Sequence, residues 1–327
     1  MLICGIESSC DETACAIVED GRHVKSSVVA SQIKTHMQFG GVVPEIAARE
    51  HLESINYVID EALKKAELNP NQIDAFAATM GPGLVGSLLV GANAAKTMAL
   101  VYKKPFVAVD HLQAHVCANF IDTTINPPFL CLLISGGHTQ LIDMPSFEKQ
   151  HIVAETIDDA VGEVYDKVAR LLGLPYPGGV LLDKRAKNGN PHAFELPIAN
   201  VKQNEFSFSG LKSAAARLIE GFDKKDLPID DICASFQHTV AETLYRKTLD
   251  YASELNYNTI VLAGGVAANS EIRRKFSALE KVENGDFIIN FPEMKYCTDN
   301  AAMVASCAYF NPIKVNDSLT LEVYSRS

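Results

Sequence analysis

The sequence lacks the excess of basic residues that self-sufficient nucleic-acid-binding proteins carry. Its 327 residues include 29 Lys and Arg but 40 Asp and Glu, so the net charge is −11 at pH 7. A broad positive field attracts phosphates, and this balance of charges does not supply one. If the substrate is RNA, the contact surface has to be a local patch or be shared with partner proteins.

Three further features are missing. The eight cysteines include no CxxC pair, and most stand in apolar runs where a thiol packs like a small hydrophobic group, so a reducing compartment fits best. The amino terminus lacks the charged start and apolar stretch of a signal peptide. The longest apolar region, residues 81–102, is interrupted by Ser87, Asn93 and Lys96, which are costly in lipid. We therefore expect a cytoplasmic protein with no membrane segment and a buried helix in this region.

What the sequence does contain is a repeated strand-turn-strand layout. Residues 2–7 and 14–19 are short runs typical of strands around a polar turn, and Asp20-Gly21 is a hairpin signal before a third run. Residues 129–134 and 140–143 repeat this pattern around the turn SGGHT. The spacing indicates an internal duplication, and a length of 327 residues favours two lobes.

Strands alternate with helices between and after these units. Residues 75–79 predict a buried strand, 84–102 a helix and 105–109 a second strand, which together form a βαβ crossover with parallel strands. Late in the chain, residues 259–262 predict a strand that leads through AGGVAAN into a helix near Ser270. Glycines at such a strand-to-helix turn let a ligand approach the backbone closely.

Two loops could carry chemistry. The first, residues 7–13, places hydroxyls and three carboxylates in one turn, which suits a metal, a hydroxylated substrate or a reaction that needs a base. The second, residues 135–139, contains two glycines that permit the close approach of a phosphate or acyl phosphate. If each loop is considered alone, the first could also be a solvated acidic turn and the second an ordinary hairpin turn.

A pair of histidines suggests a metal site. His111 and His115 lie four residues apart in DHLQAH, so on a helix spanning 112–120 both imidazoles face the same way. Asp299, at an apparent helix start, could be the third ligand and would leave positions open for water or substrate. The alternatives are core histidines and a simple helix N-cap at Thr298 or Asp299. Peptidase chemistry is disfavoured because Leu112, and not Glu, follows His111.

Two other segments give weaker signals. In residues 163–179 an amphipathic helix is followed by a Pro-Gly-Gly stop; Asp166 and Asp183 could hydrogen-bond ribose hydroxyls, and Gly179 would allow a sugar or base to lie against the backbone. The run FSFSGLK, residues 206–212, offers two serines and a lysine, but its alternation also describes a half-buried strand.

The ordered set of motifs resembles one known family over nearly the whole chain. These motifs are GIESSCDET, GGVVPEIAAREH, GPGLVGSLLVG, DHLQAH, LLISGGHTQL, YDKVARLLGLPYPGG, FSFSGLK, AGGVAAN and CTDNAAM. They resemble the bacterial TsaD family of tRNA threonylcarbamoyladenosine synthases, once labelled glycoproteases and related to the KEOPS catalytic subunit. Ser8 stands where many members have Thr, and His138 fits the bacterial form.

The resemblance implies an ASKHA (actin, sugar kinase and Hsp70-like) fold, α/β with mixed sheets, two duplicated lobes and an interlobe nucleotide cleft. Residues 1–109 plus 300–327 would form the first lobe and 110–299 the second. It implies an acyltransferase that moves the threonylcarbamoyl group of threonylcarbamoyl-AMP to N6 of the adenosine 3′ of the anticodon in tRNAs reading ANN codons, with release of AMP.

The resemblance also assigns residues and partners. The metal, Fe2+ or Zn2+, would be bound by His111, His115 and Asp299, and Asp11 and Glu12 are the catalytic candidates. The substrate-binding residues would be Leu133, Ile134, Ser135, Gly136, Gly137, Asp166, Gly179, Asp183 and Asn269. Expected partners are tRNA, the paralogue TsaB and the ATPase TsaE in a hetero-oligomer, or a homodimer when the chain is alone, and an adenine nucleotide could occupy the cleft.

Three other functions stay open at this point. A small-molecule kinase or ATPase of the same fold would need ATP and magnesium but no paired histidines. A metallopeptidase is supported only by His111 and His115. A catalytically silent scaffold is weakened by the presence of both histidines and Asp299.

Overall fold

The computed structural model describes residues 1–281, 287–313 and 318–325, and its contacts divide the chain into two compact units. Unit 1 comprises Met1–Asn126 and Pro292–Ser327, and unit 2 comprises Pro127–Phe291. Residues 110–126 and 292–299 therefore group with unit 1 by contact, although the expected lobe boundaries lie at 109 and 299. The division into functional lobes stays a prediction.

Unit 1 is built on a five-stranded mixed sheet. Its strands are β1 (Leu2–Glu7), β2 (Glu12–Glu19), β3 (His23–Ser31), β4 (Ala75–Gly81) and β5 (Phe106–Asp110), in the order β3-β2-β1-β4-β5. The first three strands pair antiparallel, and β1, β4 and β5 pair parallel. Asp20 and Gly21 both have positive φ, at 52° and 68°, and form the predicted turn between β2 and β3.

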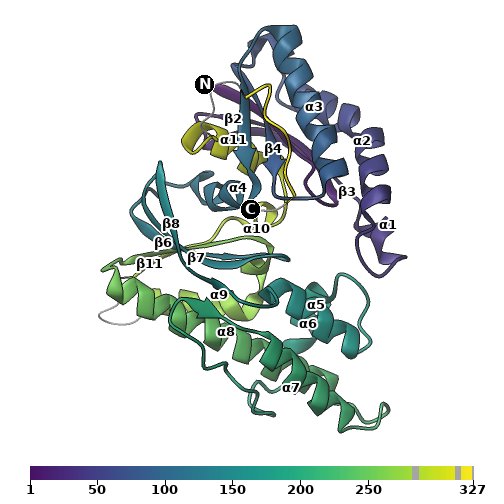
Figure 1. The fold of residues 1–327 in the computed structure, drawn as a ribbon, viewed down its shortest axis with the longest axis vertical. Helices are drawn as coiled ribbons and strands as arrows, with labels where there is room; N and C mark the ends of the chain where they lie inside the picture. Colours follow the sequence, from purple (N-terminus) through teal and green to yellow (C-terminus); the bar gives the residue numbers. More distant parts are fainter. Residues whose placement is uncertain (282–286, 314–317, 326–327) are drawn as a thin grey trace. The chain divides into compact units, whose positions relative to one another are not determined.

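Helices cover both faces of this sheet (Figure 1). On one side α2 and α3 lie side by side, and α11 packs against β1 and β2 on the other. A β-carbon at Gly5 would lie 2.6 Å from the carbonyl oxygen of Ala301, so glycine allows α11 to approach the centre of the sheet. The helices of unit 1 are α1 (Ile33–Met37), α2 (Pro44–Lys65), η1 (Pro70–Gln72), α3 (Val85–Tyr102), α4 (His111–Cys117), η2 (Ala118–Phe120), α10 (Met294–Cys297) and α11 (Ala301–Phe310).

Unit 2 has a six-stranded sheet in the order β11-β10-β6-β7-β8-β9. The strands are β6 (Phe129–Ile134), β7 (Thr139–Ser146), β8 (Lys149–Thr156), β9 (Glu205–Phe206), β10 (Thr259–Ala263) and β11 (Ile288–Asn290). Leu130, Leu132 and Ile134 of β6 lie in one core cluster with the apolar faces of the surrounding helices. These helices are α5 (Val161–Leu171), α6 (Gly178–Ala186), α7 (Ser209–Glu220), α8 (Ile229–Glu254), η3 (Gly265–Ala268), α9 (Ser270–Ser277) and η4 (Leu279–Lys281).

The two sheets confirm the predicted duplication. Strands β3-β2-β1-β4-β5 of unit 1 correspond in order and direction to β8-β7-β6-β10-β11 of unit 2, and β9 is an addition at the edge. In each unit a three-stranded meander is followed by strands that join it in parallel. The loop β1–β2 and the loop β6–β7 are therefore equivalent positions of the two repeats.

Two local predictions were wrong. The Pro-Gly-Gly segment does not stop the preceding helix, because α5 ends at Leu171 and Gly178 is the first residue of α6, after Pro177 at its N-cap. FSFSGLK is not a strand along its length, since only Phe206 belongs to β9 and a helix begins at Ser209. The two glycines can end one helix or begin the next, and alternating Phe and Ser can belong to a strand or to a loop. In both segments the backbone conformation is set by the helix that follows.

Candidate active site and metal centre

The helix α4 holds both histidines in a fixed orientation. It begins directly after β5, and Asp110 is its N-cap: the Asp110 Oδ1 atom accepts hydrogen bonds from the amides of Leu112 and Gln113 at 2.9 and 3.0 Å. His111 and His115 are one turn apart, and their ring centroids lie 4.7 Å from each other. The helical spacing therefore places two imidazoles together, as the sequence predicts.

Asp299 reaches the same point from a second helix start. Its Oδ1 lies 3.1 Å from Nε2 of His115 and 3.6 Å from Nε2 of His111. Asn300, and neither Thr298 nor Asp299, is the N-cap of α11, because its side chain accepts from the amide of Met303. The simple N-cap explanation of Asp299 is therefore wrong, and its carboxylate is available to the imidazoles.

The donor set fits a divalent transition metal ion. One ligand atom from each of His111, His115 and Asp299 lies within 4.8 Å of the others, and in the part of the chain that the structure describes no second group of three His, Cys, Asp or Glu is this close. Two imidazoles and one carboxylate leave further coordination positions open. Within the same described residues, the buried Nδ1 of His115 has no hydrogen-bond partner.

Glu7 stands behind the first histidine. This fully buried carboxylate accepts from the amide of Ser9 at 2.6 Å and from the hydroxyl of Thr79 at 2.6 Å, and its Oε2 lies 3.2 Å from Nδ1 of His111. Such a contact fixes the ring and directs Nε2 toward Asp299. The sequence placed Glu7 in the acidic first loop but did not pair it with His111; the registers of β1 beside β4 and of β4 beside β5 bring them together.

Charge governs the protonation of these groups. Burial lowers the pKa of His111, but the charges of Glu7 and Asp299 outweigh this and raise it to about 9. Burial also opposes the low pKa of Asp299, which His111 and His115 lower to about 2. The cluster therefore holds an extra positive charge between two carboxylates, which is the place that a metal ion would take with release of a proton.

Glu12 is the carboxylate best suited to accept a proton. Desolvation, with the charges of Asp11 and Asp299, raises its pKa to about 7, although a hydrogen bond from Ser31 opposes this. Its Oε1 accepts that bond at 2.8 Å, while Oε2 is buried and, within the described structure, unpartnered. Burial and Asp299 also raise the pKa of Asp11. A carboxylate with this pKa can act as a base near neutral pH.

His51 of α2 contacts the β1–β2 loop and the start of β2, a role that the sequence did not reveal. Its Nδ1 lies 2.7 Å from the hydroxyl oxygen of Thr13 and its Nε2 3.0 Å from the carbonyl oxygen of Cys10. Both ring nitrogens of this buried side chain hold the β1–β2 loop. Its presence in a motif of the resemblance, GGVVPEIAAREH, was the one available signal.

The β6–β7 loop of unit 2 is open. Gly136 and Gly137 are exposed, and a β-carbon at either would have no atom within 4 Å. The turn is held by a hydrogen bond from the Ser135 amide to the carbonyl of His138 at 2.9 Å. The loop packs against Gly162 at the start of α5. Leu133 and Ile134 are fully buried in β6, so only their backbone could contact a ligand.

The structure brings the other four predicted substrate residues together. Asp166 accepts from the amide of Gly179 at 2.9 Å, and Asp183 accepts from the amide and hydroxyl of Ser270. Asn269 is adjacent to Ser270, and its Nδ2 donates to Tyr165 and Gln237 while its Oδ1 caps α9. Asn269 therefore has its hydrogen-bonding capacity filled within the protein. Both aspartates use Oδ1 in these hydrogen bonds, and Oδ2 of Asp183 lies 4.0 Å from Nζ of Lys187.

The FSFSGLK segment has a structural role. Ser207 and Ser209 donate their hydroxyls to Asp158 at 2.5 and 2.7 Å, and Lys212 forms an ion pair with Asp159 at 2.5 Å. These contacts fasten the start of α7 to the end of β8. None of the serines of this motif is directed at the predicted substrate residues by a contact of the described structure.

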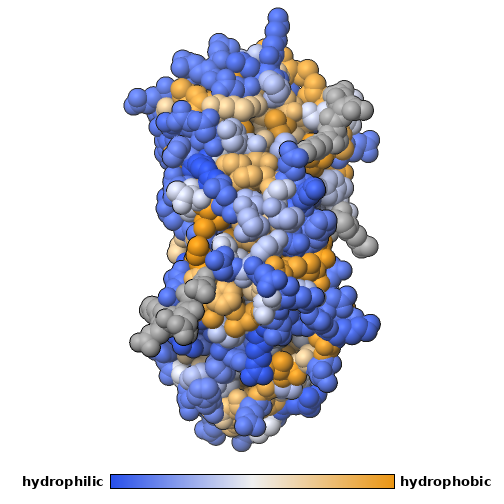
Figure 2. Space-filling model, turned by 90° about the vertical axis from the view of Figure 1, so that its left-hand side faces the viewer, coloured by the Kyte–Doolittle hydropathy of each residue, from blue (hydrophilic) through white to orange (hydrophobic). Residues whose placement is uncertain are grey.

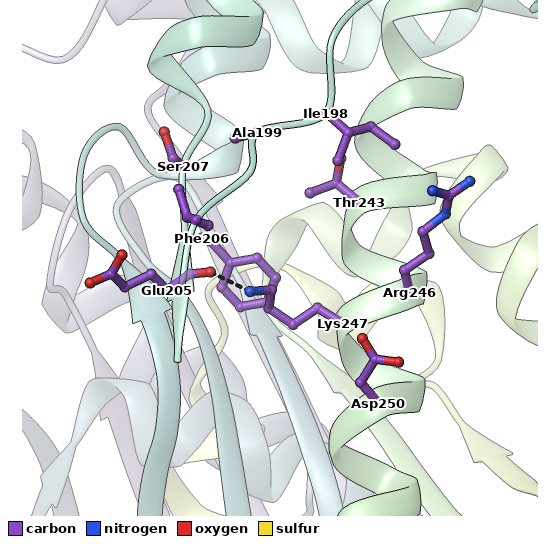
Figure 3. A pocket seen from close by; sticks show the side chains of 10 residues that line it. Ile198, Ala199, Glu205, Phe206, Ser207, Thr243, Arg246, Lys247 and Asp250 are labelled. Carbon is purple, nitrogen blue, oxygen red and sulfur yellow. Dashed lines mark hydrogen bonds between the residues drawn. The ribbon is translucent and has the colours of Figure 1, made fainter. Parts of the chain in front are cut away.

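A small pocket elsewhere in unit 2 is lined by a structural lysine. It lies between β9 and α8, as Figure 3 shows, with Lys247 pointing at the backbone of Glu205. The Lys247 ammonium donates to the carbonyls of Lys202, Gln203 and Glu205 at 2.6 to 2.9 Å and lies over the ring of Phe206. Because its three donors are used, Lys247 joins these segments and does not offer its charge to a ligand.

One helix of the described residues, α3, has the length and apolar composition of a membrane span. This composition is weak evidence for a membrane span, since the core helix of a protein can have it too. The helix α3 packs against β4 and α2. The molecular face in Figure 2 is mainly hydrophilic, with apolar patches between polar regions.

Comparisons with known proteins agree with this geometry. The family model described as "TsaD: tRNA N6-adenosine threonylcarbamoyltransferase" matches residues 23–306. A relative of that name from Caldicellulosiruptor bescii is 52% identical and covers 95% of this chain and 93% of its own length. Another from Microcystis aeruginosa is 49% identical over 94% of this chain and 91% of its own length.

Solved structures show the same fold at low identity. Full-length HypF is 14% identical, with a TM-score of 0.62 over 94% of this chain and 46% of its own length. Component A of (R)-2-hydroxyglutaryl-CoA dehydratase from Acidaminococcus fermentans is 18% identical, with a TM-score of 0.54 over 94% and 98% of the two chains. The ASKHA-type fold predicted from the sequence is confirmed. Because one family model and several close relatives cover nearly all of it, the chain belongs to the tRNA N6-adenosine threonylcarbamoyltransferase (TsaD) family.

Proposed function

We propose that this chain, an acyltransferase of its family, moves the threonylcarbamoyl group of threonylcarbamoyl-AMP to N6 of the adenosine 3′ of the anticodon in tRNAs reading ANN codons. The observation that carries the proposal is the convergence of His111, His115 and Asp299 within 4.8 Å. A kinase of this fold needs no such cluster. Peptidase chemistry through HExxH is opposed by Leu112, which is 5% exposed at the position where that motif carries its catalytic Glu.

In the proposed reaction N6 attacks the carbamoyl carbon. A C–N bond forms, the bond between that carbon and the phosphate oxygen breaks, and AMP leaves with the electron pair. A divalent ion at His111, His115 and Asp299, Fe2+ or Zn2+, would polarise an oxygen of the donor. The exocyclic amine is a poor nucleophile, so positioning and the activated donor supply most of the acceleration.

The chain's own residues have two tasks in this scheme. Glu12 takes the proton that N6 loses, a role supported by its pKa of about 7 and its unpartnered Oε2 among the described residues, with Asp11 as the neighbouring candidate. In unit 2, the open backbone of residues 135–137 receives the acyl-phosphate end, and Leu133 and Ile134 contribute backbone only. Asp166, Gly179, Asp183 and Asn269 receive the adenosine: the two aspartates would accept from ribose hydroxyls, and Asn269, whose hydrogen bonds lie within the protein, would contact the ligand by packing.

The acidic chain needs partners to hold tRNA. With a net charge of −11 it provides no broad field for phosphates. We propose a hetero-oligomer with the paralogue TsaB and the ATPase TsaE in the cytoplasm, with a homodimer as the state of the chain alone. The partner surface would include α2, where Leu52 and Tyr57 are 62% and 63% exposed. Exposed apolar side chains of this size favour contact with protein over solvent.

The direct test is transfer of the group to unmodified tRNA. The chain, its two partners, the acyl-adenylate and the tRNA are incubated, and the digested nucleosides are weighed by mass spectrometry. We expect the modified nucleoside with wild type, and none above background with the His115→Ala or Glu12→Gln variants. Hydrolysis of ATP by the chain without any modified nucleoside would indicate a kinase or ATPase instead, and metal analysis of the purified chain distinguishes iron from zinc.

A further inference from the structure

The described carboxy-terminal residues 318–325 form a strap across unit 1. They have no regular secondary structure, yet hydrogen bonds attach them to the sheet and to α3. The Ser318 hydroxyl donates to the carbonyl of Phe106, the Lys96 ammonium to the carbonyl of Leu321, and the Tyr324 amide to the carbonyl of Met80, at 2.5, 2.6 and 2.9 Å. Leu321, Val323 and Tyr324 also pack against the core of this unit.

The last anchor of the strap is the side chain of Tyr324. Its hydroxyl donates to Oδ2 of Asp110 at 2.6 Å, while Oδ1 of the same carboxylate caps α4. Both oxygens of Asp110 are thus engaged, one with the strap and one with the first turn of the helix that presents His111. A chain of contacts runs from Tyr324 through Asp110 to the amides of Leu112 and Gln113.

The backbone beneath Tyr324 is shaped for this contact. Gly81 has φ +154°, and a β-carbon there would lie 2.3 Å from the carbonyl oxygen and 2.6 Å from Cδ2 of Tyr324. Gly81 is also paired with Asp110 in the register of β4 and β5. The first glycine of the GPG segment therefore lets Tyr324 approach Asp110, and the third, Gly83, lets the loop at Ser9 approach, since a β-carbon there would meet the Ser9 carbonyl at 2.6 Å.

We propose that Tyr324 is a positioning residue for the metal centre, acting through Asp110 on the first turn of α4. This inference rests on the proposed metal site. The helix has only seven residues, so its end would fray easily without a well-held cap, and His111 is its first residue. Holding Asp110 in one rotamer holds that turn, and the turn sets the imidazole relative to His115 and Asp299.

The test is the affinity of the purified chain for Zn2+ in competition with a chromophoric chelator. Tyr324→Phe removes one hydroxyl and keeps the ring against Gly81. Loss of one hydrogen bond to a carboxylate predicts a dissociation constant about three- to tenfold higher than wild type. The matched control is Tyr257→Phe, which removes a hydroxyl that donates to the carboxylate of Asp143 in unit 2 at 2.8 Å and should leave the constant unchanged within about twofold.

Two further measurements separate positioning from general stability. Amide hydrogen exchange in the metal-free protein should rise in the peptide containing residues 110–118 and stay unchanged in unit 2. In an Asp110→Asn background, the additional Tyr324→Phe change should alter the Zn2+ constant less than twofold, because the two groups act in series. The Co2+ absorption spectrum of Tyr324→Phe should keep the wild-type form at saturation.

The outcomes are distinct. Unchanged Zn2+ affinity and unchanged exchange of residues 110–118 in Tyr324→Phe would overturn the role of Tyr324 while leaving the metal centre intact. Equal and additive losses from Tyr324→Phe and Asp110→Asn would overturn it as well. If His115→Ala binds Zn2+ as tightly as wild type, or wild type binds none, the proposed metal centre itself fails. That result is visible before any change at Tyr324 is made.

Discussion

The two hairpin loops at equivalent positions of the repeats have opposite characters. The start of the β1–β2 loop of unit 1 is closed and polar: Glu7, Ser8 and Ser9 are at most 2% exposed, and the side chain of each of these three contacts another element. The β6–β7 loop of unit 2 is open, with two exposed glycines. One strand order therefore supports two kinds of site.

The difference shows what each repeat contributes to the proposed chemistry. Unit 1 collects side chains, with imidazoles from α4 and carboxylates from β1, from the β1–β2 loop and from Asp299, which precedes the N-cap of α11. Unit 2 presents backbone, because glycine leaves amides uncovered and its nearby aspartates are tied to helix starts. Side-chain chemistry is suited to metal binding and proton transfer, and uncovered backbone is suited to phosphate.

The largest expected effect is in unit 1. His115→Ala removes a ligand that no neighbouring residue can replace, so metal content should fall to background. If the ion supplies about 4 kcal/mol of transition-state stabilisation, transfer drops roughly 10³-fold. Metal analysis and the nucleoside assay check this. The matched control is His151→Ala, an exposed histidine of β8, which should keep full metal content and activity. Retention of a tenth of the activity by His115→Ala would break the assignment of metal chemistry to unit 1.

The next effect separates two glycines of unit 2. Gly264 has φ +87°, and a β-carbon there would lie 2.4 Å from the carbonyl oxygen of Ile134. Gly264→Ala should therefore lower the free energy of unfolding by about 3 kcal/mol, because a strained backbone conformation and a clash combine. Gly136→Ala should change it by less than about 0.5 kcal/mol. Urea denaturation measures both.

Binding of the acyl-adenylate donor should depend on the open loop, although the stability of the protein does not. Gly136→Ala should weaken binding of the acyl-adenylate in a calorimetric titration, because its added methyl group stands where the ligand is proposed to approach. A Gly136→Ala protein with wild-type donor affinity would show that the open loop of unit 2 is an ordinary hairpin turn.

The fold could be predicted from the sequence because local patterns determine most of it. Residues 129–134 form a continuous apolar run and are the strand β6, and the strand-helix-strand pattern over 75–109 has its predicted order. The turn at Asp20-Gly21 was predictable because few residue pairs adopt two positive φ angles. The ends of elements were harder to predict. At Gly178, for example, the Gly-Gly dipeptide can end one helix or begin the next.

The site was predictable only in part. His111 and His115 were found because helical spacing places them together, but Asp299 is 184 residues beyond His115, and nothing local links them. Its position at an apparent helix start made Asp299 one candidate for the third ligand, and the resemblance assigned it that role. Glu7, His51 and Tyr324 could not be assigned roles, because their partners depend on strand register and on packing between distant segments.

A smaller effect is expected behind the metal ligands. Glu7→Gln keeps the size of the side chain but removes the charge that orients His111 through Nδ1. Loss of such a partner typically reduces metal affinity about 10- to 100-fold. Chelator competition with Zn2+ measures this, and Glu195→Gln, at an exposed position of unit 2, serves as the control. A wild-type Zn2+ constant in Glu7→Gln would mean that the closed loop only fills space.

The smallest effects are pH dependences of opposite sign in the two units. Burial, with the charges of Asp11 and Asp299, raises the pKa of Glu12 from its usual 4.5 to about 7, so the folded state binds this proton more tightly than the unfolded state. The contribution is fully present below pH 4.5 and is lost as pH rises toward 7. In metal-free protein the unfolding free energy of wild type should fall over this range relative to Glu12→Gln, by roughly 1–3 kcal/mol.

Asp159 of unit 2 should show the reverse. Hydrogen bonds from Lys167 and Lys212 lower the pKa of its carboxyl, although burial opposes them. Its stabilising effect is present above the unfolded-state pKa of 3.8 and is lost as pH falls through the folded-state value. Wild type should lose stability relative to Asp159→Asn below pH 4, and by less than the Glu12 effect because solvent screens this pair. Urea titrations from pH 3 to 8 on both variants give the two slopes. Slopes of the same sign would contradict the contrast between a desolvated acid in unit 1 and an ion-paired acid in unit 2.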